Sequence, residues 1–162
     1  EEIPIANNPI TPSPSEEISP PKKIIKNTID IEFGKGIAML EPLPKPGRGS
    51  TESETWKIIY RNGDHAEASK ILEELIQNGA KGDQIIFYAA LCQLPLENYS
   101  TAISRFDQLI NDGSFFAKKA LWFRSLAYYK TGDLEKAKAD WQFIIANEGH
   151  KKQEAIKLLN QN

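Results

Sequence analysis

The chain has 162 residues, of which 40% are hydrophobic and 26% are charged, and its formal net charge is −2. This balance is typical of a soluble globular protein and does not favour general binding to polyanions such as nucleic acid. No apolar run is long enough for a membrane span or a signal peptide, and the single cysteine excludes an intrachain disulfide.

Residues 1–50 are rich in proline, since nine of the ten prolines lie there among Ser, Thr, Asn and Glu. Proline blocks helix interiors and central strands, so residues 1–21 are expected to form an extended, mobile spacer. The more apolar stretch 24–40 is expected either to dock on the repeats, as a strap or short helix, or to stay loose. The sequence therefore predicts a spacer over 1–50 and a folded domain over 51–162.

A pattern then recurs three times at offsets of 34 and 35 residues. In each copy an Asp or Asn precedes an alanine by four positions, and large apolar residues follow that alanine at four and seven positions. This spacing places the apolar side chains on one helix face, with polar residues such as Asp140 facing water. The alanines are Ala68, Ala102 and Ala137, and the apolar residues are Leu72 and Leu75, Phe106 and Leu109, and Trp141 and Ile144.

Helix start and stop signals fit this period. The side chains of Asp64, Asn98 and Asp133 can cap helices, and Asp64 forms a possible capping box with Glu67. Glycines are expected to end helices at three positions, Gly79, Gly113 and Gly149. The sequence predicts seven helices, at about 51–62, 64–78, 83–94, 98–111, 115–131, 133–147 and 150–160.

The repeats resemble the tetratricopeptide repeat family, whose unit is a helix, a turn and a second helix in 34 residues. Residues 121–137 match the family pattern best, whereas Leu94-Pro95-Leu96 replaces the usual glycine-containing turn. The resemblance implies an all-α, right-handed solenoid of three helix hairpins, closed by a C-terminal capping helix. It also implies a scaffold that binds proteins and is not an enzyme.

In that family the first helix of each unit lines a concave groove that binds a partner. Carried over to this chain, the pattern predicts an aromatic and basic groove that suits a peptide with apolar anchors and a carboxylate. The alternative is that Phe87 and Trp122 pack internally, and their burial relative to the polar flank distinguishes the two. The predicted partner-binding residues are Tyr60, Arg61, Phe87, Leu91, Lys119, Trp122, Leu126, Tyr129 and Lys130, with Lys57 and Leu94 beside them.

Other candidate sites are weaker. Cys92 lies in an apolar run and is interpreted as a buried, inert thiol. His65 and His150 have no companion at metal-ligand spacing and are interpreted as surface residues. We therefore expect no catalytic residue, no metal site, no cofactor, no small-molecule substrate and no nucleic-acid partner.

Basic residues gather in the third repeat, where a solvated polar face is preferred to a binding site for an anion or an acidic peptide. These residues are Lys118, Lys119, Arg124, Lys130, Lys136 and Lys138.

The proline-rich stalk followed by repeats also resembles a group of Bacteroidetes-type proteins in which a membrane helix precedes a periplasmic tetratricopeptide-like domain. The matching stretch is residues 122–128. This resemblance implies a membrane anchor ahead of Glu1 and a periplasmic location, with a cytoplasmic location as the alternative. An envelope-side sensory or regulatory domain of a signalling protein is the alternative to a protein-interaction module.

Overall fold

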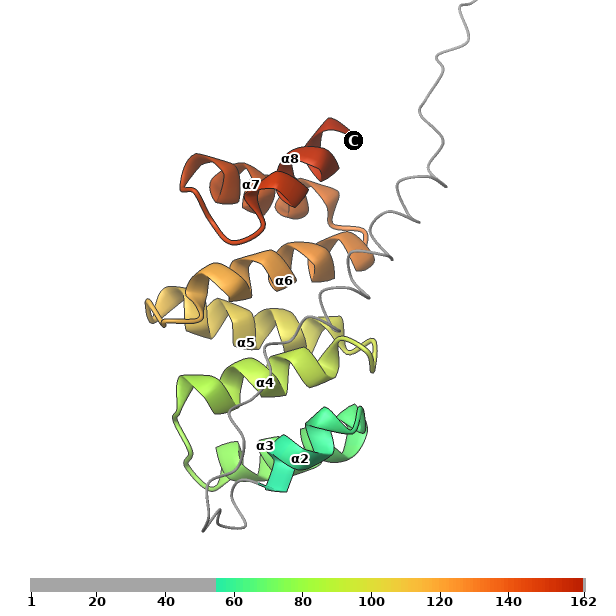
Figure 1. The fold of residues 1–162 in the computed structure, drawn as a ribbon, viewed down its shortest axis with the longest axis vertical. Coiled ribbons are helices and arrows are strands. Elements are labelled where there is room, and N and C mark those ends of the chain that lie inside the picture. The colour runs from blue at the N-terminus through green and yellow to red at the C-terminus, as the bar shows by residue number, and fades with distance from the viewer. Residues whose placement is uncertain (1–54, 162) are drawn as a thin grey trace, which may run out of the picture.

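A computed structural model describes residues 55–161 of the chain, and this range is all-helical, with seven helices and no strand (Figure 1). The sequence predicted both ends of every described helix to within two residues, except the start of the first helix, which was expected at about residue 51 and lies at Thr55. The predicted spacer lies outside the described residues. The helices are α2 (Thr55–Arg61), α3 (His65–Gln77), α4 (Asp83–Gln93), α5 (Tyr99–Asn111), α6 (Ala117–Lys130), α7 (Leu134–Ala146) and α8 (Lys152–Asn160).

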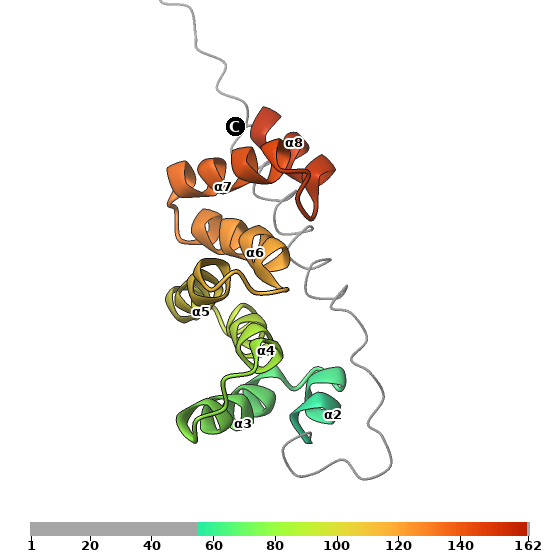
Figure 2. The ribbon, with the colours of Figure 1, turned by 90° about the vertical axis from the view of Figure 1, so that its left-hand side faces the viewer.

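Each helix packs against the next one along the chain, from α2 to α8. Figure 1 shows the helices stacked along the long axis of the molecule. Figure 2 shows that they form two rows, with α3, α5 and α7 on one side and α2, α4, α6 and α8 on the other. We call the face of α2, α4 and α6 that points away from α3, α5 and α7 the inner surface.

The repeated apolar stripe forms the core between the two rows. The three alanines of the pattern are completely buried, and Leu72, Phe106 and Trp141 are buried on the same faces of α3, α5 and α7. Alanine at these positions leaves room for close helix contacts, and the large residues one turn later fill the space between the rows. Helices α4 and α6 differ from these three because their buried residues lie on several sides of the helix.

Two of the three predicted caps are present. Asp64 Oδ1 accepts a hydrogen bond from the Glu67 N–H at 3.0 Å, and Asp133 caps α7 through the Lys136 N–H. The capping box is incomplete, because the Glu67 side chain accepts from Lys70. The prediction for Asn98 was wrong: its side chain donates to Gln93 Oε1 and makes no cap hydrogen bond.

The last predicted helix stop works differently from the other two. Gly79 and Gly113 have positive φ values, as expected, whereas at the third stop the left-handed residues are Glu148 and Lys151. Gly149 is required for another reason. A Cβ there would lie 3.2 Å from backbone and side-chain atoms of Ile144, so glycine lets the chain pass close to α7.

Candidate interaction surface

The structure buries most of the predicted groove residues. Five of the nine have buried side chains, and Trp122 and Leu126 have no exposed surface at all. Three others are half-buried, whereas Arg61 at the end of α2 is exposed. The expected open groove with accessible rings is therefore not present. The buried residues are Tyr60, Phe87, Leu91, Trp122 and Leu126, and the half-buried ones are Lys119, Tyr129 and Lys130.

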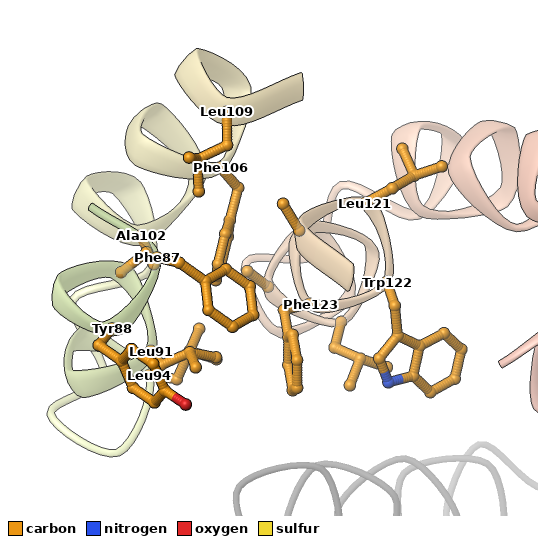
Figure 3. Close-up of a cluster of buried hydrophobic side chains, with 14 of the residues drawn as sticks. Phe87, Tyr88, Leu91, Leu94, Ala102, Phe106, Leu109, Leu121, Trp122 and Phe123 are labelled. Carbon is orange, nitrogen blue, oxygen red and sulfur yellow. The ribbon is translucent and has the colours of Figure 1, made fainter. Parts of the chain in front are cut away.

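Phe87 of α4 packs internally. Its ring stacks on Phe116 with centroids 4.7 Å apart and meets the rings of Phe106 and Phe123 edge-on at 6.2 and 6.1 Å. Figure 3 shows the side chains of Phe87, Phe106 and Phe123 converging between α4, α5 and α6. Phe87 therefore packs internally, as the alternative prediction stated, because α6, the next helix of the same row, covers its ring.

Trp122 of α6 occupies the equivalent position 35 residues later, but it points away from the aromatic cluster, as Figure 3 shows. Its direction follows from Arg124, whose guanidinium bonds Asp107 of α5 and Asp140 of α7. Trp122 and Leu126 stand two residues on either side of Arg124. At about 100° per residue, both therefore project to the opposite face of α6, away from α5 and α7.

The indole nitrogens of two tryptophans have contrasting environments. Trp141 Nε1 donates to Ser125 Oγ at 2.8 Å, inside the core. Trp122 Nε1 is buried and has no hydrogen-bond partner among the described residues. A buried N–H without an acceptor costs about 1–3 kcal/mol. Trp122 therefore carries an unused donor on the inner surface.

Arg124 corrects two expectations. It was predicted among solvated basic residues, and Asp140 was predicted to face water, but Asp140 is buried and Arg124 is half-buried against it between α6 and α7. Arg124 donates to both Asp140 oxygens at 2.9 and 2.6 Å and to Asp107 at 2.6 Å. Burial alone would lower the pKa of Arg124, but these two carboxylates raise it. Burial raises the pKa of Asp140, partly offset by Arg124.

A second, uncharged network links α4 to α3 and to the start of α5. Gln93 of α4 donates to Ser69 Oγ of α3 at 2.8 Å, and its Oε1 accepts from Asn98 at 2.9 Å. Sequence reasoning missed both networks, because single polar residues between apolar ones were assigned to the solvent side. Their positions on helices that are otherwise apolar all round could have revealed them.

The inner surface has a polar and basic edge. Arg61, Lys119, Tyr129 and Lys130 each take part in a polar, ring or electrostatic interaction within the chain. Elsewhere in the basic cluster, Lys136 pairs with Asp133 at 2.6 Å in an exposed position.

The other candidate residues are Cys92, His65 and the possible metal ligands. Cys92 is completely buried, and burial raises its pKa to about 12, in agreement with an inert thiol. His65 is half-buried beside the Tyr60 ring, which corrects its surface assignment, and burial lowers its pKa. Within residues 55–161 no three His, Cys, Asp or Glu side chains gather to hold a metal ion. No helix in this range is long and apolar enough to cross a membrane.

Comparison with known protein families, with curated proteins and with solved structures finds no match for this chain.

Proposed function

We propose that residues 51–162 form a right-handed, tetratricopeptide-like solenoid that binds an extended peptide or protein segment on its inner surface. Three helix pairs at offsets of 34 and 35 residues and a final short helix support this architecture. The function is protein interaction without catalysis and without a cofactor.

The environment of Trp122 carries this proposal. Its ring lies on the side of α6 that faces neither α5 nor α7, and its indole N–H has no acceptor within residues 55–161. An extended segment on this surface would bring backbone carbonyls that can accept from the indole. Trp141 has the same chemistry but is satisfied by Ser125, as a residue with a purely structural role should be.

The charges favour an acidic segment. Lys119 and Lys130 flank Trp122 and Leu126 on α6, at positions 11 residues apart along the helix. Apolar side chains of the bound segment can pack against the buried rings, while the lysines at the edge orient its carboxylates. Binding should therefore weaken as the salt concentration rises.

A peptide-display selection on the full chain tests the function. We expect selected peptides to alternate apolar and acidic residues, and their Kd to rise at least tenfold when the chain carries Lys119→Glu and Lys130→Glu. The matched control is Lys70→Glu with Lys81→Glu, two exposed lysines of α3 and the following loop, which should leave the Kd unchanged. Selected peptides that bind both variants equally well would contradict the proposed surface.

A periplasmic location, a membrane anchor and a sensory role rest on the resemblance of the stalk and repeats, and they stay proposals. Fractionation of cells that express the full gene tests the location. Recovery with the envelope is the expected result, and recovery in the cytoplasm would contradict it.

A further inference from the structure

The inner surface is apolar and yet closed. On α4 every residue from Ile86 to Leu94 is buried, and on α6 Trp122 and Leu126 have no exposed surface. The main packing neighbours of α4 are α3 and α5, and those of α6 are α5 and α7. All three lie in the opposite row (Figure 2). Within the inner row, rings of α2 and α6 also cover Tyr88 and Phe87 of α4, whereas Trp122 makes no ring contact among residues 55–161. The contacts of α5 and α7 account for one side of α6 and leave its inner side to be covered by something else.

A segment of the same chain has the composition to cover it. Within residues 24–40, Ile29, Ile31 and Phe33 alternate with Asp30 and Glu32. In an extended backbone, alternate residues point to opposite sides. Such a strap therefore has one apolar edge and one acidic edge, which match the rings and the lysines of the inner surface.

The length of this segment also fits. Its 17 residues reach about 56 Å when extended, at about 3.3 Å per residue. Four helices in one row, about 10 Å apart, span about 30 Å. Residues 41–54 then remain to return the chain to Thr55, where α2 begins.

We propose that residues 24–40 of this chain lie extended along the inner surface and occupy the site to which an outside segment would bind. The strap places Ile29, Ile31 and Phe33 against the rings, and Asp30 and Glu32 beside the lysines. This proposal rests on the proposed function, because residues 24–40 would occupy the same binding surface from within the chain. The partner must displace the strap, so the chain inhibits its own binding site.

The linker between the strap and the helices determines how strongly the strap competes with an outside peptide. A segment joined by a short linker acts at an effective concentration of about 1 mM, so an outside peptide competes poorly with it. Removing the apolar edge of the strap should free the surface without touching residues 55–161.

The test uses a fluorescein-labelled synthetic peptide of residues 24–40 and the full chain. We expect weak binding to the wild type and binding at least tenfold tighter to the variant Ile29→Asp/Ile31→Asp/Phe33→Asp. A matched control, Ile3→Asp/Ile5→Asp/Ile10→Asp, places the same charges in the predicted spacer and should bind as weakly as the wild type.

The second arm tests the charges. In the triple variant, Lys119→Glu with Lys130→Glu should lower peptide affinity at least tenfold. A peptide with Asp30→Lys and Glu32→Lys should restore it. Loss of affinity without restoration would mean that the lysines do not meet the acidic edge.

The outcomes separate the strap from the function. Equal, tight binding to the wild type and the triple variant would overturn the strap and leave the peptide-binding surface intact. No binding to either would overturn the strap, while the display selection would still decide the function. A concentration-dependent dimer that disappears in the triple variant would place the strap on a second copy, which also overturns the intrachain proposal.

Discussion

Helices α4 and α6 occupy equivalent places in successive repeats but solve the same packing problem with different chemistry. Position 89 in α4 is a completely buried alanine, whereas its equivalent 35 residues later is Arg124, paired with two aspartates. Ala90 likewise corresponds to Ser125, which accepts from Trp141. One backbone arrangement thus accepts either a small apolar contact or a satisfied ion-pair network, provided that the neighbouring helices supply the partners.

The largest loss of stability is expected when an arginine like Arg124 of α6 is placed at the equivalent position of α4. Ala89→Arg would bury a guanidinium where the equivalents of Asp107 and Asp140 are Glu73 and Arg105, which already pair with each other. Because Arg105 already occupies the one carboxylate and adds a like charge, we expect a loss of more than about 4 kcal/mol in the free energy of unfolding. Chemical denaturation followed by circular dichroism measures it. Ala66→Arg, at an exposed site of α3, should change stability little; an equally stable Ala89→Arg chain would refute the equivalence.

The reverse exchange should cost less. Arg124→Ala leaves Asp140 buried without its partner, and we expect a loss of about 2–4 kcal/mol, since the network is partly solvated. Adding Asp140→Ala should recover part of that loss in urea denaturation. Lys136→Ala, which breaks only an exposed pair, is the control and should cost less than about 1 kcal/mol. A double variant less stable than Arg124→Ala alone would show that Asp140 is held by other contacts.

A smaller effect concerns the Ser125–Trp141 hydrogen bond. Ser125→Ala leaves the indole N–H without its acceptor and should cost about 1–2 kcal/mol. Combining it with Trp141→Phe recreates the Ala90 and Phe106 pair of the preceding repeat. The double variant should lose about 1 kcal/mol less than the sum of the two single losses in a denaturation cycle. Strict additivity would mean that the hydrogen bond contributes nothing to stability.

The smallest expected effect is chemical. Burial raises the pKa of Cys92 to about 12, so at pH 8 the folded chain holds on the order of 1 thiolate in 10,000. We expect a disulfide reagent to modify Cys92 only at the rate at which the chain opens, and rapidly once urea unfolds it. Fast modification of the folded chain at pH 8 would contradict the burial of α4.

Helix positions could be predicted because they depend on local periodicity. The spacing of Ala102, Phe106 and Leu109 defines one face of α5 without any knowledge of its neighbours, and all three are buried there. The surroundings of Asp140 could not be predicted in this way. Whether a polar residue meets water or a guanidinium depends on a helix packed against it from elsewhere in the chain.

The burial of the predicted groove residues could not be predicted from the sequence. Trp122 and Leu126 lie on the inner side of α6, yet neither is accessible. Sequence spacing specifies the direction of a side chain on its helix. It does not specify what covers that side chain, because the apolar stretch at 24–40 is distant in sequence from the residues that it would meet.

The central claim is that the inner surface binds an extended segment with alternating apolar and acidic residues, and that residues 24–40 supply one. Nuclear Overhauser contacts from the Trp122 indole N–H in the isotopically labelled full chain test it most directly. The account predicts contacts from this proton to side chains of Ile29, Ile31 or Phe33. Contacts confined to residues 55–161 would contradict it.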